Sequence, residues 1–168
     1  EELEADAGEV TWGYETHPGY FSQGHEELVG SERATIHDWL WQFCPDQSTG
    51  WVRHRLAEVL FVDDDVFKLL GALSGGEAAR VIFSKLSVLQ PNVLVLDEPT
   101  NHLDLEGIEA LAQGLKSYDG TIIFVSHDRW FVGQLATRVF EITLEGVDDY
   151  VGDYARFMEH KDIDHLQR

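Results

Sequence analysis

The sequence predicts an α/β protein with a parallel sheet, and three observations support this fold class. Two short apolar runs, 93–96 and 121–125, each end in polar residues and are each followed by a helical pattern. Such runs are typical of strands that a parallel sheet buries on both faces. The third observation is the alternation of strand and helix from residue 91 onward, which is the order found in parallel α/β sheets.

The first 25 residues are predicted to form a β-hairpin followed by a polar segment. Apolar and aromatic residues lie on both sides of a turn within 8–21, and Gly and Pro mark its boundaries. The polar residues 22–25 come directly afterwards. We therefore expect Gln23 to lie at the end of a strand.

Residues 26–90 have a helical pattern instead. Thr35 and Asp38 have the spacing of a helix cap, and 52–60 carries apolar residues at helical intervals. A further helix is expected over about 78–89. We predict that this stretch forms a mostly helical lobe.

Four residues immediately before the helix at 78–89 have a pattern of their own. Ser74 and Glu77 have the spacing of a capping box, in which the side chain of each residue accepts a hydrogen bond from the backbone N–H of the other. Gly75 and Gly76 between them leave backbone amides open to a ligand at the positive end of the helix, which would suit a phosphate. The alternative is that these residues only cap a helix.

The rest of the chain continues the alternating pattern. Helices are expected over about 105–117 and 129–135, strands near 138–143 and 146–151, and a closing helix from Tyr154. Together with the two apolar runs, these elements complete the predicted α/β unit.

Composition excludes several classes of function. The net charge of −19 opposes binding of nucleic acid over the whole surface, so any such contact needs a local patch or other segments. A single cysteine, Cys44, excludes an internal disulfide framework and fits a reducing compartment. No apolar stretch approaches the roughly 20 residues that span a bilayer, and the acidic start does not resemble a signal peptide.

Asp97 and Glu98 end the apolar run 93–96. The carboxyl ends of strands are where open α/β sheets bind their ligands. Two carboxylates at the end of a buried strand are costly unless a cation or a reacting water compensates them. The alternative is that these acids merely cap the next helix.

Five motifs follow one another in an order that chance would rarely supply. They are Gln23; Leu73, Ser74, Gly75, Gly76 and Glu77; Asp97 and Glu98; Asn101, His102, Leu103 and Asp104; and Ser126, His127 and Asp128. This order resembles the nucleotide-binding domain of the ATP-binding-cassette (ABC) superfamily over nearly the whole chain. The residues of the segments 97–104, 125–129 and 150–157 resemble those of the ABC-F subfamily. Glu77 with the following Ala-Ala-Arg-Val resembles the second cassette of that subfamily.

The resemblance implies a role for each motif in Mg²⁺-dependent ATP hydrolysis, where positioning and charge stabilisation provide most of the catalysis. Gln23 looks like the Q-loop glutamine, which contacts Mg²⁺ and the attacking water. Asp97 would hold Mg²⁺ through water, Glu98 would polarise the nucleophilic water, and His127 would contact the γ-phosphate. Residues 73–77 look like the signature motif, which acts on the nucleotide of the opposite cassette, and 101–104 like the D-loop.

One motif of the superfamily does not occur in the sequence. The Walker A loop, Gly-x-x-x-x-Gly-Lys-Ser/Thr, is missing, and residues 1–10 resemble the segment that follows its helix. The predicted fold is thus a P-loop NTPase core without its Walker A strand and loop, joined to a helical subdomain. We expect the isolated chain to be inactive, with its remaining strands unpaired or repacked at the missing strand.

The resemblance also implies a domain division and partners. Residues 1–25 would hold the hairpin and Q-loop of the core, 26–90 the helical subdomain, and 91–168 the core with Walker B, D-loop and switch histidine. ABC-F proteins are cytoplasmic ATPases with two cassettes in one chain and no membrane domain. The expected partners are the other cassette and the ribosome, coupled to translation. The alternatives are the ATPase subunit of a membrane transporter and a truncated, non-catalytic interaction module.

Overall fold

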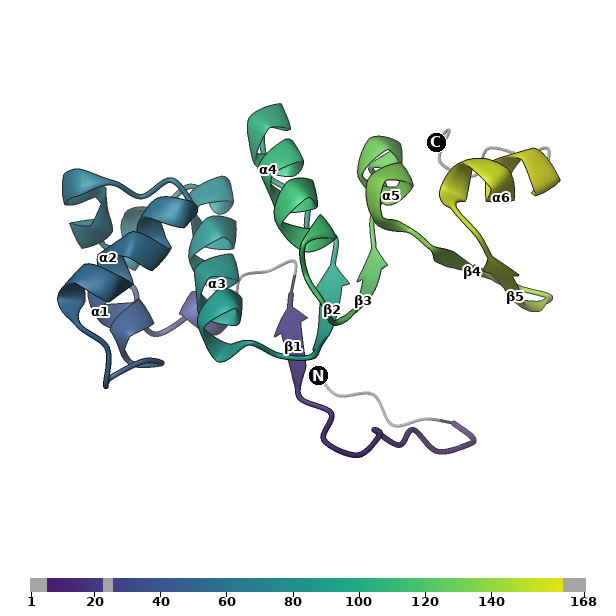
Figure 1. The fold of residues 1–168 in the computed structure, drawn as a ribbon, viewed down its shortest axis with the longest axis horizontal. Helices are drawn as coiled ribbons and strands as arrows, with labels where there is room; N and C mark the ends of the chain where they lie inside the picture. Colours follow the sequence, from purple (N-terminus) through teal and green to yellow (C-terminus); the bar gives the residue numbers. More distant parts are fainter. Residues whose placement is uncertain (1–5, 23–25, 162–168) are drawn as a thin grey trace.

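The computed structural model describes residues 6–22 and 26–161 (Figure 1). Its strands are β1 (Pro18–Phe21), β2 (Val93–Asp97), β3 (Thr121–Val125), β4 (Arg138–Thr143) and β5 (Gly146–Val151). Its α-helices are α1 (Ile36–Trp41), α2 (Thr49–Glu58), α3 (Gly75–Leu89), α4 (Leu105–Lys116), α5 (Arg129–Leu135) and α6 (Tyr154–Lys161), and 3₁₀ helices cover Glu26–Leu28, Asp63–Phe67 and Leu70–Ala72. In the described part of the chain, no helix is long and apolar enough to cross a membrane.

The centre of the fold is a three-stranded parallel sheet with the order β1-β2-β3. Pro18 pairs with Val93, which in turn pairs with Thr121, so the three strands start level with one another. Because the strands are parallel and level, their carboxyl ends lie at one edge of the sheet (Figure 1). The predicted parallel α/β fold is confirmed.

The predicted hairpin at 8–21 is wrong. Among the described residues of this segment, only β1 is a strand, and it pairs in parallel with β2 rather than with its own neighbours. The side chain of Asn92 fixes this arrangement, because its Oδ1 accepts from the His17 backbone N–H at 2.7 Å and its amide donates to the Glu15 carbonyl. The segment before β1 thus leads the chain into the edge strand of the sheet.

The prediction that 93–96 is buried on both faces is also wrong. Leu94 and Leu96 are buried beneath the helices, whereas Val93 and Val95 on the alternate face are only half-buried. The contrast is larger on β3, where Ile123 is 53% exposed and Val125 is 60% exposed. The reason is that the described residues cover only one face of this sheet, so its strands alternate in burial as a one-sided sheet does.

The helical character predicted for 26–90 is confirmed, because the regular elements between residues 26 and 89 are helices and 3₁₀ helices. Thr35 caps α1 by accepting from the Asp38 N–H at 3.1 Å, as its spacing predicted. Ile36, Leu40, Val52, Leu56, Val81 and Ile82 form the centre of its core, each fully buried. Phe21 of β1 stacks on Phe83 of α3 at 4.5 Å and ties this lobe to the sheet.

The last strands, β4 and β5, form a separate antiparallel pair, at the boundaries that the sequence predicted. Helix α6 packs on one face of the pair, where Lys161 binds the carboxylates of both Glu141 and Asp148. On the other face Phe140 and Ile142 are exposed. The pair shares no ladder with β3 (Figure 1), so the described strands form two sheets rather than one.

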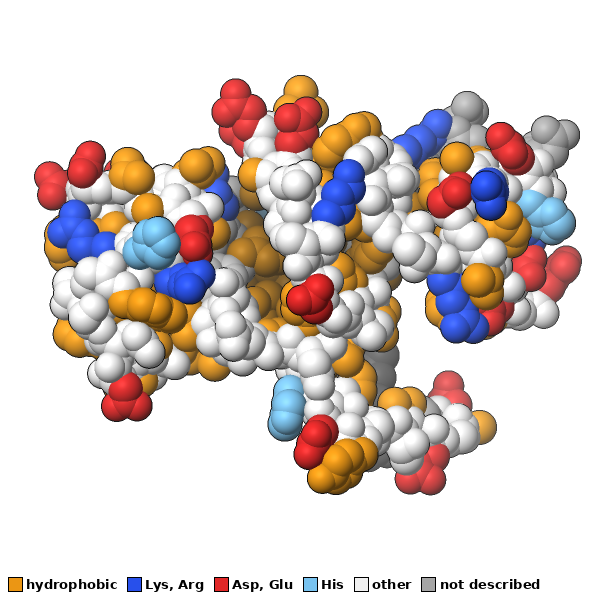
Figure 2. Space-filling model, in the orientation of Figure 1, with side chains coloured by type: hydrophobic (Ala, Val, Ile, Leu, Met, Phe, Trp, Pro, Cys, Tyr) orange, Lys and Arg blue, Asp and Glu red, His pale blue; other side chains and the backbone are white. Residues whose placement is uncertain are grey.

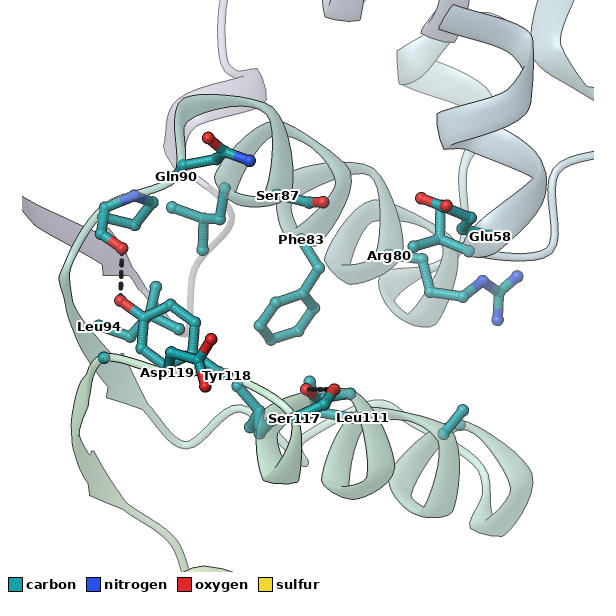
Figure 3. Close-up of a pocket in the computed structure, with 18 of the residues that line it drawn as sticks. Glu58, Arg80, Phe83, Ser87, Gln90, Leu94, Leu111, Ser117, Tyr118 and Asp119 are labelled. Atoms are coloured by element: carbon teal, nitrogen blue, oxygen red, sulfur yellow. Dashed lines mark hydrogen bonds between the residues drawn. The ribbon is translucent and has the colours of Figure 1, made fainter. Parts of the chain in front are cut away.

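An apolar groove of about 710 Å³ lies between α3 and α4 (Figure 3). Phe83 points into it from α3, Leu111 lines it from α4, and Tyr118 closes one end by donating to the Pro91 carbonyl. Figure 2 shows it as a hollow lined with hydrophobic side chains beside the helical lobe. Neither Asp97 nor Glu98 lines this groove, so it is separate from the carboxylates singled out by the sequence.

Candidate nucleotide site

Glu98 is held in an uncommon conformation directly beyond β2. Its backbone N–H donates to the Val125 carbonyl at 2.9 Å, which extends the pairing of β2 and β3 by one bond. Its φ of 46° lies in the left-handed region, which is uncommon for residues other than glycine. The side chain is 10% exposed. A carboxylate held this way, in a strained backbone conformation and largely out of water, is typical of a functional position.

The loop after β3 supplies the groups that surround this carboxylate. The His127 backbone N–H donates to Glu98 Oε2 at 3.2 Å, and His127 Nε2 lies 3.4 Å from Glu98 Oε1. The imidazole itself is 86% exposed, so it remains accessible to a ligand. The level carboxyl ends of β2 and β3 therefore bring Glu98 and His127 together.

A pair of hydroxyl groups also joins these two loops. Thr100 Oγ1 and Ser126 Oγ are 3.0 Å apart, and Ser126 Oγ also accepts from the Asp128 N–H at 3.1 Å. Asp128 in turn caps α5 by accepting from the Phe131 N–H at 2.8 Å. These contacts fix the loop after β3 relative to the turn after β2.

Asp97 provides a second carboxylate, on the last residue of β2, and is partly exposed. Among the described residues, no group of three or more His, Cys, Asp or Glu side chains could enclose a metal ion. The carboxylates of Asp97 and Glu98 fit Mg²⁺, which usually takes one or two carboxylates and completes its octahedron with water and substrate phosphates.

The residues 98–104 form a compact turn between β2 and α4. The Asn101 N–H donates to the Glu98 carbonyl at 3.1 Å, and the Leu103 N–H donates to the Thr100 carbonyl at 3.2 Å. Asp104 then caps α4 by accepting from the Gly107 N–H at 2.8 Å. The alternative that Asp97 and Glu98 only cap the next helix is therefore wrong, because the cap of α4 is Asp104.

The predicted capping box at the start of α3 is confirmed. Ser74 Oγ accepts from the Glu77 N–H at 3.3 Å, and Glu77 Oε2 accepts from the Ser74 N–H at 2.9 Å. The helix begins at Gly75, three residues earlier than expected. The amides of Gly75 and Gly76 are thus the ones that the capping box leaves open at the helix N-terminus.

Electrostatics at this helix start are set by Glu77 and Lys68. The hydrogen bond from the Ser74 N–H, followed by that from Lys68, holds the pKa of Glu77 below its ordinary value. Lys68 lies 3.1 Å from Glu77 and 2.9 Å from Asp65, and these carboxylates raise its pKa. The ion pair offsets part of the negative charge that Glu77 places near the open amides.

The structure brings together most of the residues that the sequence singled out. Glu98, His127 and Asp97 lie around the ends of β2 and β3, and the glycines of α3 lie against the turn at His102. Gln23 lies outside the described residues.

Sequence reasoning missed two contributors. Thr100, whose hydroxyl lies 3.0 Å from that of the motif residue Ser126, could have been sought, because it directly precedes the predicted site residue Asn101. No pattern in the sequence pointed to Lys68, because it lies nine residues before Glu77 and the two side chains meet only through the fold.

Comparison with known proteins defines the class. The chain matches the ABC transporter family over residues 4–101, more than half of its length, and belongs to that family. It is therefore an ABC ATP-binding domain, in agreement with the fold and the strand-end carboxylates.

The relatives narrow the class further. The chain is 44% identical over 165 residues, 97% of its length, to the probable ATP-binding protein YbiT of Escherichia coli O157:H7. It is 37% identical over 158 residues, 94% of its length, to ABC transporter F family member 5 of Arabidopsis thaliana, and 37% identical over 139 residues, 81% of its length, to the ATP-binding protein Uup of Escherichia coli K12. The chain is a cassette of the ABC-F type. It spans only 31%, 22% and 20% of these relatives, respectively.

Proposed function

We propose that this chain is part of the second nucleotide-binding domain of an ABC-F ATPase, which binds and hydrolyses ATP. The observation that carries the proposal is the pairing of Glu98 and His127 at the level ends of β2 and β3. A largely buried carboxylate with an accessible imidazole 3.4 Å away can hold and polarise a water molecule beside a phosphate.

The proposed roles follow from these positions. Glu98 directs the attacking water, and the donation from the His127 N–H leaves Glu98 Oε1 oriented for it. Asp97 holds Mg²⁺, which supplies charge neutralisation on the phosphates when bound. His127 contacts the terminal phosphate, and Gln23 joins the Mg²⁺ and water contacts.

The start of α3 serves a second nucleotide. Leu73, Ser74, Gly75, Gly76 and Glu77 form the signature motif, and the open amides of its glycines bind the terminal phosphate held by the other cassette. Residues 26–90 would carry this motif as a subdomain, while 1–25 and 91–168 form the core. The first partner is therefore the other nucleotide-binding domain of the same protein.

The phosphate cradle is proposed to come from residues outside this sequence. Two features support this: among the described strands β3 pairs with β2 alone, and the face that carries Ile123 and Val125 is exposed. A strand added beside β3 would pair its open edge. The 168 residues alone are then expected to lack turnover, because no Walker A loop occurs in them.

Coupling to the ribosome and translation, in the cytoplasm, is proposed from the resemblance of 97–104, 125–129 and 150–157 to ABC-F proteins. The net charge of −19 is compatible with it if other segments make the RNA contacts.

The experiment compares Mg-ATP turnover by the 168-residue chain with turnover by a longer natural protein in which a Walker A loop precedes residue 1. We expect turnover only in the longer protein. Turnover by the chain alone that requires Glu98 would contradict the proposed origin of the cradle. An inactive longer protein that binds no Mg-ATP would instead favour a non-catalytic interaction module.

A further inference from the structure

The two glycines that open α3 pack directly against the turn that follows β2. A Cβ atom placed on Gly75 would lie 2.9 Å from the Cβ and 3.1 Å from the Cγ of His102. A Cβ atom placed on Gly76 would lie 2.9 Å from the His102 carbonyl oxygen. Contacts this short leave no room for a side chain on either residue.

The requirement for glycine here comes from close approach rather than from backbone conformation. Neither Gly75 nor Gly76 is among the residues with positive φ in the described structure. The unusual conformation belongs to the partner, because His102 has a φ of 68°. The turn therefore presents both the side chain and the carbonyl of His102 to the start of α3.

The same turn contains Glu98. The hydrogen bonds from the Asn101 N–H to the Glu98 carbonyl and from the Leu103 N–H to the Thr100 carbonyl make 98–103 a compact unit. Leu103 packs beside the hydrophobic core, which anchors the far end of that unit. A fixed path of contacts thus joins the water-directing carboxylate to the open amides of α3.

We propose that His102 is a positioning residue, whose contact with Gly75 and Gly76 holds the amides at the start of α3 in register with Glu98. This inference rests on the proposed function. If Glu98 acts on the nucleotide of this cassette and the amides act on the nucleotide of the other, one turn sets the geometry of a group in each site.

The test exploits the difference between the two glycine contacts. In Gly75→Ala, the three nearest atoms to the new methyl group all belong to the His102 side chain, so His102→Gly removes the collision. In Gly76→Ala the new methyl group meets the His102 backbone oxygen, which His102→Gly leaves in place. Glycine also accepts a φ of 68°, so that the turn itself tolerates the substitution.

The variants are compared in the longer, two-cassette ATPase. We expect Gly75→Ala to lower kcat by about 10²-fold, because a displacement of about 1 Å can have that effect, with little change in the KM for ATP. The double variant Gly75→Ala/His102→Gly should recover at least about tenfold of that loss. Gly76→Ala should lose activity and should not recover with His102→Gly. Gly114→Ala is the matched control, because a Cβ there meets nothing within 4 Å and kcat should be unchanged.

Two results would overturn the inference. One is a Gly75→Ala variant that keeps full activity. The other is a loss of kcat in Gly75→Ala that His102→Gly does not relieve, because such a loss would indicate that Gly75 contacts the phosphate instead. Hydrogen exchange of the Glu77 and Ala78 amides, which are bonded to Ser74, gives an independent readout. It should accelerate in His102→Gly even if the wild-type protein proves to have no ATPase activity, so failure of this inference and failure of the proposed function are distinguishable.

Discussion

Two regions of the molecule are suited to phosphate chemistry, and they are built in opposite ways. The turn after β2 presents side chains, with the Glu98 carboxylate held by the His127 backbone N–H of the loop after β3. The start of α3 presents backbone amides, because the side chains of Ser74 and Glu77 each already accept from the other residue's backbone N–H in the capping box. We therefore expect the first region to be sensitive to chemical substitution of one side chain, and the second to changes in packing and helix geometry.

The largest expected effect is that of Glu98→Gln in the two-cassette ATPase. The amide keeps the size of the side chain and can still accept from the His127 N–H, but it is a poor base. Turnover should fall about 10²–10⁴-fold, whereas Mg-ATP binding should change little. Steady-state ATPase assays and equilibrium binding of ATP measure the two quantities separately.

Glu109→Gln is the control for this substitution. Glu109 is an exposed carboxylate on α4, and its replacement makes the same change in charge. Equal losses in the two variants would show that net charge, rather than the position of Glu98, explains the effect.

A smaller effect is expected from Ser74→Ala at the start of α3. The substitution removes the hydroxyl that accepts from the Glu77 N–H, and losing an N-cap of this kind reduces the free energy of unfolding by about 1 kcal/mol. Urea denaturation of the chain measures the change. Ser87→Ala, at an exposed position later in the same helix, is the matched control and should not destabilise it. An equally large loss of unfolding free energy in Ser87→Ala would show that the effect at Ser74 does not come from capping.

The smallest effect is the pH dependence contributed by Glu77. Its pKa is lower in the folded chain than its ordinary value, mainly because of the Ser74 N–H. The ionised form therefore stabilises the fold fully above the ordinary carboxyl pKa, and this contribution is lost as the pH falls through the lower, folded-state pKa.

Glu77→Gln isolates this contribution, because glutamine can still accept from the Ser74 N–H but does not ionise in this range. The difference in free energy of unfolding between wild type and variant should shrink as the solution is acidified into the carboxyl range. A difference that stays constant across that range would be inconsistent with a lowered pKa at Glu77.

Much of the fold could be predicted from local patterns. The strand at 121–125, the helices α4 and α5 and the capping box of α3 all have signals within a few adjacent residues, and all were found where expected. The meeting of Glu98 and His127 was also predictable, since parallel strands that start level bring their carboxyl ends together.

The errors concern long-range partners. Whether 8–21 pairs with itself or with β2 is decided by Asn92, which lies 75 residues after the His17 that it binds. The exposure of Ile123 and Val125 depends on what covers the second face of the sheet, and the strand's own residues do not specify it. The packing of His102 against Gly75 and Gly76 likewise joins two segments that carry no mutual signal in the sequence.

The most direct test of the central claim is a single-turnover measurement on the Glu98→Gln variant of the two-cassette ATPase, with protein in excess over radiolabelled Mg-ATP. The account predicts that the ATP of this cassette is bound and remains uncleaved, because the water lacks its directing carboxylate. Cleavage of that ATP at the wild-type rate would contradict the assignment of Glu98, and with it the proposal that the turn after β2 is the hydrolytic half of the site.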